Sequence, residues 1–146
     1  MENLVSKNIL VLCTGNSCRS QIAEAYLRKF CGGHAQVYSA GIEKHGVNPK
    51  AVAIMLEDGI DITSHTSNEI SDFLHIPFDI VITVCDHAKE VCPVLPGNAV
   101  KFHQSFPDPA KATGSDEDIL ATFRSVRNQI RLFCEQWSHD FVSGEL

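Results

Sequence analysis

The stretch that decides the fold is Asn8-Ile-Leu-Val-Leu-Cys13-Thr14-Gly15-Asn16-Ser17-Cys18-Arg19-Ser20. Its first half, residues 8–13, is a short apolar run that is typical of a buried strand, and Thr14-Gly15-Asn16 is typical of a turn. A helical pattern begins at about Ser20 and ends at Gly32-Gly33. A strand that passes through a short turn directly into a helix indicates an α/β fold.

The rest of the chain repeats this alternation of apolar runs and helical patterns. Strands are predicted at 37–40, 79–84 and 99–103, and Asn48-Pro49 begins a helix that ends at Asp58-Gly59. After Gly114-Ser115, apolar residues recur at helical spacing: Ile119, Phe123, Val126, Ile130, Phe133, Trp137 and Phe141. The sequence therefore predicts a doubly wound, three-layer α/β/α fold with a four-stranded parallel sheet, in which ligands bind at the carboxyl ends of the strands.

Composition limits the classes of protein to which the chain can belong. Its 146 residues suit one domain, residues 1–146, and 44% hydrophobic residues can form a core. No apolar run approaches the about 20 residues that cross a bilayer, and no signal peptide is recognised, so we expect a cytoplasmic monomer. The net charge of −6 weighs against nucleic-acid binding, although residues 1–50 carry six basic and three acidic side chains.

The turn after the first strand has the features of an oxyanion-binding loop. Its backbone N–H groups, from Thr14 to Arg19, and the amino end of the following helix favour an anion, and the Arg19 guanidinium can contact two of its oxygens. The same field should lower the pKa of Cys13 and make it a nucleophile, with a hydrogen bond from Ser20. The alternative interpretation is a buried cysteine at a strand end. The predicted oxyanion-binding residues are Thr14, Gly15, Asn16, Ser17, Cys18 and Arg19.

Several segments in the same order resemble one known family. LCTGNSCRSQIAEA, YSAGIEKHGVNP, LEDGIDI, TVCDHAKEVCPVLPG and FPDPAKATGSDED are similar to segments of the low-molecular-weight protein tyrosine phosphatases, and especially to the thioredoxin-coupled arsenate reductases built on that fold. The resemblance implies arsenate as substrate, with phosphate or sulfate as analogues. It implies thioredoxin, or alternatively glutaredoxin, as the reductant.

The resemblance also implies an acid that protonates the departing oxygen. Asp108, in Phe106-Pro-Asp-Pro-Ala110, matches the general acid of the family. The alternative is an aspartate that only shapes a turn before proline. Because Ala110 stands where the phosphatases would carry an aromatic side chain that stacks on phosphotyrosine, this segment favours a small inorganic substrate.

Two further cysteines match the resolving cysteines of the reductases. The resemblance implies that Cys85 attacks the Cys13 sulfur, that Cys92 then attacks Cys85, and that thioredoxin reduces the resulting disulfide. Residues seven apart in a helix lie about 10 Å apart, whereas a disulfide needs Cα atoms about 4.4–6.8 Å apart, so a helix over 86–91 must unwind. The alternatives are core cysteines or, with His87, a zinc site. The remaining cysteines are expected to be buried bystanders: Cys18, Cys31 and Cys134.

Some relatives in this family also hold a potassium ion beside the loop. The matching positions are Asn16, Glu24, Ser39 and Asn68, and Asn68 replaces an expected carboxylate. The alternative is that Asn16 and Ser39 only brace the loop. His45 is interpreted as a surface histidine of the GIEKHGVNP segment. Two other functions remain open: a phosphatase of the same fold, and a non-catalytic oxyanion or thiol-redox sensor.

Overall fold

The computed structural model describes residues 6–92 and 98–146. Its sheet contains strands β1 (Lys7–Cys13), β2 (Ala35–Gly41), β3 (Ile80–Thr83) and β4 (Val100–His103), in the spatial order β2-β1-β3-β4. All three pairings are parallel. The predicted four-stranded parallel sheet is therefore confirmed, and the strands over 79–84 and 99–103 begin one residue later than expected.

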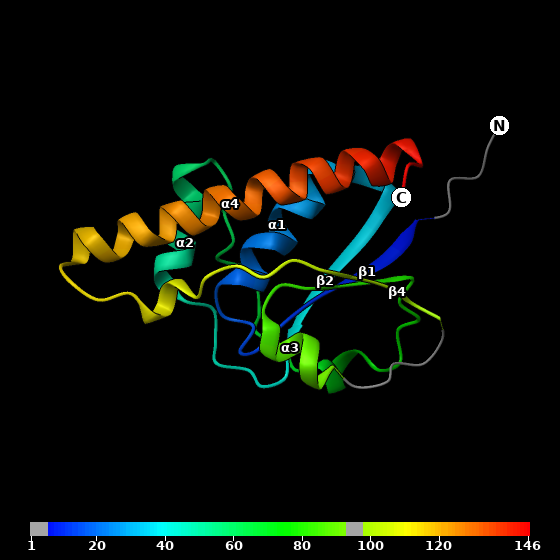
Figure 1. Ribbon diagram of the computed structural model, residues 1–146, viewed down its shortest axis with the longest axis horizontal. Helices are drawn as coiled ribbons and strands as arrows, with labels where there is room; N and C mark the ends of the chain where they lie inside the picture. Colours follow the sequence, from blue (N-terminus) through cyan, green and yellow to red (C-terminus); the bar gives the residue numbers. More distant parts are fainter. Residues whose placement is uncertain (1–5, 93–97) are drawn as a thin grey trace.

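The helices cover both faces of this sheet (Figure 1). Helix α1 (Arg19–Cys31) and the 28-residue helix α4 (Asp116–Ser143) lie together along one side, and α3 (Asp86–Val91) lies on the other. Helix α2 (Pro49–Glu57) packs against the amino-terminal half of α4. Short 3-10 helices span Gly32–His34, Ile70–Phe73 and Pro109–Lys111. This arrangement confirms the three-layer α/β/α prediction.

The hydrophobic core lies between the sheet and the α1–α4 pair. Ile9 to Leu12 of β1 are completely buried, as expected for a central strand covered on both faces. The buried residues of α4 are Cys134, Ser138 and four members of the predicted stripe: Phe123, Val126, Ile130 and Trp137. Cys31 and Cys134 are buried in this core, which confirms their interpretation as packing residues.

Helix α4 begins where the sequence indicated. Ser115 accepts a hydrogen bond from the Asp118 N–H, and the Asp118 carboxylate accepts one from the Ser115 N–H, which forms a capping box. Within the described residues, no helix is long and apolar enough to cross a membrane.

The parallel pairing of β1 with β3 brings Cys13 and Cys85 to the same region of the fold. Leu12 is aligned with Thr83, and the Val84 N–H donates to the Leu12 carbonyl at 3.0 Å. Cys13 directly follows Leu12 and Cys85 lies two residues after Thr83, so both cysteines emerge at the same edge of the sheet. Two cysteines that are 72 positions apart in the chain become neighbours in this way.

Candidate active site

The backbone of the oxyanion loop, which we define as residues 13–19, has its carbonyl groups turned outward. The carbonyls of Cys13, Thr14, Gly15 and Ser17 accept hydrogen bonds from backbone N–H groups of residues 42, 43, 45 and 48, at 2.9–3.1 Å. The Asn16 carbonyl accepts from the Gln21 amide at 3.1 Å. Because the carbonyls point away, the N–H groups of the loop face its interior, which is the arrangement that binds an oxyanion.

Asn16 holds the loop in this shape. Its φ angle of 48° lies in the left-handed region, which asparagine tolerates better than most residues. The buried side chain donates to the Ser20 and Ser39 hydroxyls at 2.8 and 2.9 Å and accepts from the Asn68 N–H at 2.8 Å. The expectation that Asn16 and Ser39 brace the loop is confirmed.

Arg19, the last residue of the oxyanion loop, has its side chain near Asp108. Arg19 is the first residue of α1, and its Nη1 donates to the Phe106 carbonyl at 3.1 Å. Its Nη2 lies 3.7 Å from the Asp108 carboxylate, which also accepts a hydrogen bond from the Ala110 N–H at 3.0 Å. Asp108 therefore shapes the turn, as the alternative interpretation stated, and also lies near the arginine, while its role as the general acid stays a prediction.

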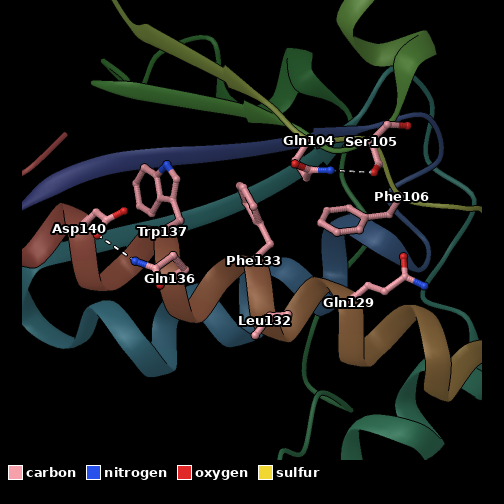
Figure 2. Close-up of a pocket in the computed structure, with 9 residues that line it drawn as sticks. All are labelled: Gln104, Ser105, Phe106, Gln129, Leu132, Phe133, Gln136, Trp137 and Asp140. Carbon is pink, nitrogen blue, oxygen red and sulfur yellow. Dashed lines mark hydrogen bonds between the residues drawn. The ribbon is translucent and has the colours of Figure 1, made fainter.

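A groove of about 510 Å³ lies next to Phe106, and its lining includes residues of α4. Figure 2 shows the Phe106 ring beside Phe133 of α4, with their centroids 5.8 Å apart, and Trp137 farther along the same helix. Phe106 is 6% exposed, so its packing fixes the carbonyl that accepts from Arg19. The packing of Phe106 in the wall of this groove thus contributes to the position of the Arg19 guanidinium, although the groove lies outside the oxyanion loop.

The Cys13 and Cys85 thiols form a buried, hydrogen-bonded pair. This hydrogen bond and burial raise the pKa of Cys13, although the Arg19 guanidinium acts in the opposite direction. The same hydrogen bond, together with those from Thr14 and the Ala88 N–H, lowers the pKa of Cys85 to about 5. The negative charge of the pair therefore lies on Cys85, and Cys13 keeps its proton. The expectation of a lowered Cys13 pKa is wrong for this arrangement, because sequence alone does not show that Cys85 is its neighbour.

Replacing Cys85 by alanine should lower the pKa of Cys13, because the thiolate that holds the Cys13 proton is removed while Arg19 remains. The parent should show one thiolate step near pH 5, from Cys85, in the ultraviolet absorbance at 240 nm. In Cys85→Ala this step should disappear, and a Cys13 step should emerge at a lower pH than in the parent. Cys31→Ser is the matched control and should leave the step near pH 5 unchanged. An unchanged step in Cys85→Ala would contradict the assignment.

Helix α3 separates Cys85 from Cys92, which meets the condition under which the sequence requires an unwinding step. Cys85 is the residue before the helix, where its sulfur accepts a hydrogen bond from the Ala88 N–H at 3.4 Å, and Cys92 follows the last helical residue. All six cysteines are present as thiols. With the helix intact, Cys85 and Cys92 lie at opposite ends of it, so a bond between them requires the helix to unwind.

Two of the remaining expectations at this site need correction or refinement. Ser20 is buried, but its hydroxyl accepts from Asn16, and the described residues show no hydrogen bond from Ser20 to Cys13. Cys18 is 5% exposed and burial raises its pKa to about 11, which fits a bystander. His45 is half-exposed as predicted, and its ring also packs against Gly15, so a side chain at position 15 would collide with it.

The four residues of the expected potassium site were tested against the contacts they make. The Glu24 carboxylate is within 2.9 Å of the Arg28 guanidinium and also accepts from the Ser39 hydroxyl. The Asn68 side-chain amide donates to Thr66. Because Arg28 already supplies the positive charge opposite Glu24, these residues do not fit a potassium ion in this arrangement. The described residues also contain no cluster of metal-ligating side chains, which leaves the zinc alternative at Cys85, His87 and Cys92 without support.

Two features of the site were not recognised in the sequence. Residues 42–48 align the loop through their backbone, and only the general position of GIEKHGVNP near the site hinted at this. The Thr14 hydroxyl lies 3.3 Å from the Cys85 sulfur, whereas the sequence indicated only a backbone role for Thr14. No sequence signal could have revealed this contact, because it joins residues that follow two different strands.

Comparison with known proteins extends the similarity to most of the chain. The sequence profile of the low molecular weight phosphotyrosine protein phosphatase family matches residues 8–144. An arsenate reductase of Halalkalibacterium halodurans is 54% identical over 124 residues, which cover 85% of this chain and 89% of that protein. A structure of an arsenate reductase in the phosphate binding state has a TM-score of 0.69 at 32% identity. Another, of an arsenate reductase in oxidized state, has a TM-score of 0.76 at 30% identity. Both structures cover 92% of this chain and are themselves covered to 98%.

Proposed function

Because the chain belongs to the low molecular weight phosphotyrosine protein phosphatase family, we propose that it uses this scaffold to reduce arsenate to arsenite. The observation that carries the proposal is the buried contact between the Cys13 and Cys85 thiols. A phosphatase needs one nucleophilic cysteine, whereas a reductase needs a second thiol within reach of the first. The relatives named arsenate reductase, which match over most of the chain, support the same conclusion.

The first step is the attack of the Cys13 sulfur on arsenic(V). The Cys85 thiolate accepts the Cys13 proton across their hydrogen bond, and a new sulfur–arsenic bond forms as one arsenic–oxygen bond breaks. Asp108 supplies the proton with which that oxygen leaves as water. The loop N–H groups and the Arg19 guanidinium stabilise the oxyanion, because they are aimed at it before the reaction begins.

The second step reduces arsenic. Cys85 loses its proton to solvent and attacks the Cys13 sulfur, so a disulfide forms and the sulfur–arsenic electron pair remains on arsenic as arsenite. The Thr14 hydroxyl, the Ala88 N–H and Arg19 favour the attacking thiolate, since each lowers the pKa of Cys85. The balance is one arsenate and two thiols converted to arsenite, a disulfide and water.

The third step moves the disulfide away from the oxyanion loop. The Cys92 thiolate attacks the Cys85 sulfur and expels Cys13 as a thiolate, after α3 has unwound. The dithiol of thioredoxin, or alternatively of glutaredoxin, then reduces the Cys85–Cys92 disulfide. Such a relay requires a reducing compartment, so we place the protein in the cytoplasm. We also propose that it acts as a monomer.

The residues next to Asp108 favour a small inorganic substrate. Ala110 and Lys111 follow Asp108-Pro109, and Ala110 provides no ring that could stack on an aryl ester. The loop accommodates a tetrahedral oxyanion, and a related reductase has been solved in the phosphate binding state. Phosphate and sulfate are therefore expected to compete with arsenate.

The proposal is tested by arsenate-dependent NADPH consumption with thioredoxin and thioredoxin reductase, and with glutaredoxin in a parallel assay. We expect turnover with arsenate that stops when thioredoxin is omitted, and competitive inhibition by phosphate. An aryl phosphate and phosphotyrosine are assayed alongside. Turnover of phosphotyrosine with none of arsenate would establish the phosphatase instead. Absence of all three activities in a folded protein would favour a non-catalytic sensor.

A further inference from the structure

Helix α3 is held to the rest of the molecule by few contacts. Of its six residues, only Ala88 is buried. Its first turn is closed by two hydrogen bonds to Cys85, from the Ala88 N–H to the sulfur at 3.4 Å and from the Lys89 N–H to the carbonyl at 3.2 Å. A helix this short is unstable alone, so its contacts with neighbouring elements decide whether it stays folded.

A hydrogen-bonded series of three polar side chains, Thr83, His103 and Asp86, connects the sheet to this helix. Thr83 ends β3 and is aligned with His103, which ends β4. The Thr83 hydroxyl lies 2.7 Å from His103 Nδ1, and His103 Nε2 lies 3.0 Å from the Asp86 carboxylate. Asp86 occupies the first turn of α3, directly after Cys85. His103 therefore connects the ends of two strands to the helix that must unwind.

The exposed fractions of these three side chains show which of them the surrounding protein holds in place. Thr83 is 6% exposed, the His103 side chain 22% and the Asp86 side chain 75%. The histidine ring is thus held by the sheet on one side, while Asp86 would lie free in solvent without it. A carboxylate at the amino end of a helix also stabilises the helix through its dipole, and the His103 contact keeps it there.

We propose that His103 is a positioning residue that keeps α3 folded through Asp86 and thereby slows the transfer of the disulfide from Cys13–Cys85 to Cys85–Cys92. In this transfer Cys92 attacks Cys85, Cys13 leaves as a thiolate, and no external oxidant is consumed. Among the described residues, the side-chain hydrogen bonds of His103 go to Thr83 and Asp86 and not to the oxyanion loop, to Cys13 or to Cys85, so we infer that it acts through the helix. The kinetic part rests on the proposed function, whereas the structural part concerns the reduced protein alone.

The structural part is tested on the reduced protein without arsenate, by amide hydrogen exchange at Ala88 and Lys89. In His103→Ala these amides should exchange about three to five times faster, the size expected when one partly exposed charged contact is lost. His103→Gln, which keeps a donor toward Asp86, should recover part of the protection. His139→Ala, at an exposed histidine of α4, is the matched control and should leave both amides unchanged.

A double-mutant cycle identifies the partner of His103. Asp86→Asn should also speed exchange, and adding His103→Ala to it should have little further effect, because the contact is already weakened. Fully additive effects would show that His103 acts elsewhere. Unchanged exchange in His103→Ala, or an equal change in His139→Ala, would overturn the proposal.

The kinetic part uses a single turnover with arsenate, quenched by alkylation, with mass spectrometry to identify the disulfide present. In His103→Ala, formation of Cys13–Cys85 should keep the parent rate, while its conversion to Cys85–Cys92 should be about three to five times faster. A slowed first step with an unchanged second would overturn the proposal. If the parent forms no disulfide with arsenate while the exchange results hold, the proposed function fails and the structural role of His103 stands.

Discussion

Cys92→Ser is expected to release one arsenite per chain and then stop. The oxyanion loop, Arg19, Asp108 and the Cys13–Cys85 pair remain in place, so the first two steps proceed at the parent rate. The serine hydroxyl cannot attack the Cys85 sulfur, and the Cys13–Cys85 disulfide accumulates with both sulfurs buried. Because thioredoxin must reach a sulfur to reduce it, turnover should fall below detection although the first arsenite is formed.

Arsenite is quantified against enzyme concentration in the presence of excess NADPH, thioredoxin and thioredoxin reductase. The parent should produce arsenite continuously, and Cys92→Ser should reach a plateau at about one equivalent. Cys31→Ser removes a thiol in the core that donates to Ser138, and it should retain continuous turnover. Continuous turnover by Cys92→Ser would show that thioredoxin reduces Cys13–Cys85 directly, and the proposed third step would then be wrong.

Arg19→Lys is expected to lower kcat/KM for arsenate by about 10²–10³-fold, the loss typical of one oxyanion-stabilising donor. The guanidinium is planar, and one of its ends already donates to the Phe106 carbonyl while the other lies near Asp108. A lysine ammonium is a single point charge on a flexible chain and cannot keep these contacts while binding two oxygens of the substrate. The inhibition constant of phosphate should rise as well, because phosphate uses the same donors.

Arg124→Lys is the matched control for this change. Arg124 forms an ion pair with Glu57 on the exposed side of α4, far along the chain from the loop, and its replacement should leave kcat/KM within about twofold. Thermal unfolding of both variants shows that the effect is not a loss of fold. Parent-like kcat/KM in Arg19→Lys would contradict the role of the guanidinium.

Much of the fold could be predicted because its signals are local. The apolar run before Cys13 indicated a buried strand, and Asn48-Pro49 and Gly114-Ser115 marked helix starts that the structure places at the same positions. The alternation of these elements implied parallel strands, whose carboxyl ends share one edge of the sheet. The location of the nucleophile and of Arg19 in the oxyanion loop followed from that rule.

The charges of the site could not be predicted in the same way. A lowered Cys13 pKa is reasonable for a loop that favours anions, but the Cys85 sulfur beside it takes the negative charge instead. The potassium expectation did not take account of a similar neighbour, the Arg28 guanidinium, which lies 2.9 Å from the Glu24 carboxylate. In both cases the group that matters, Cys85 or Arg28, is close in space, and no local sequence pattern predicts that it lies there.

By itself, the amino-acid sequence determined the order of the main strands and helices and the oxyanion loop with Cys13 and Arg19. These depend on backbone preferences and hydrophobic spacing within about 30 residues. Only the tertiary structure decided which thiol carries the charge, which carbonyl holds Arg19, and how His103 reaches Asp86. Such features depend on distances between side chains from different strands, and electrostatic and hydrogen-bond energies change steeply over a few ångströms.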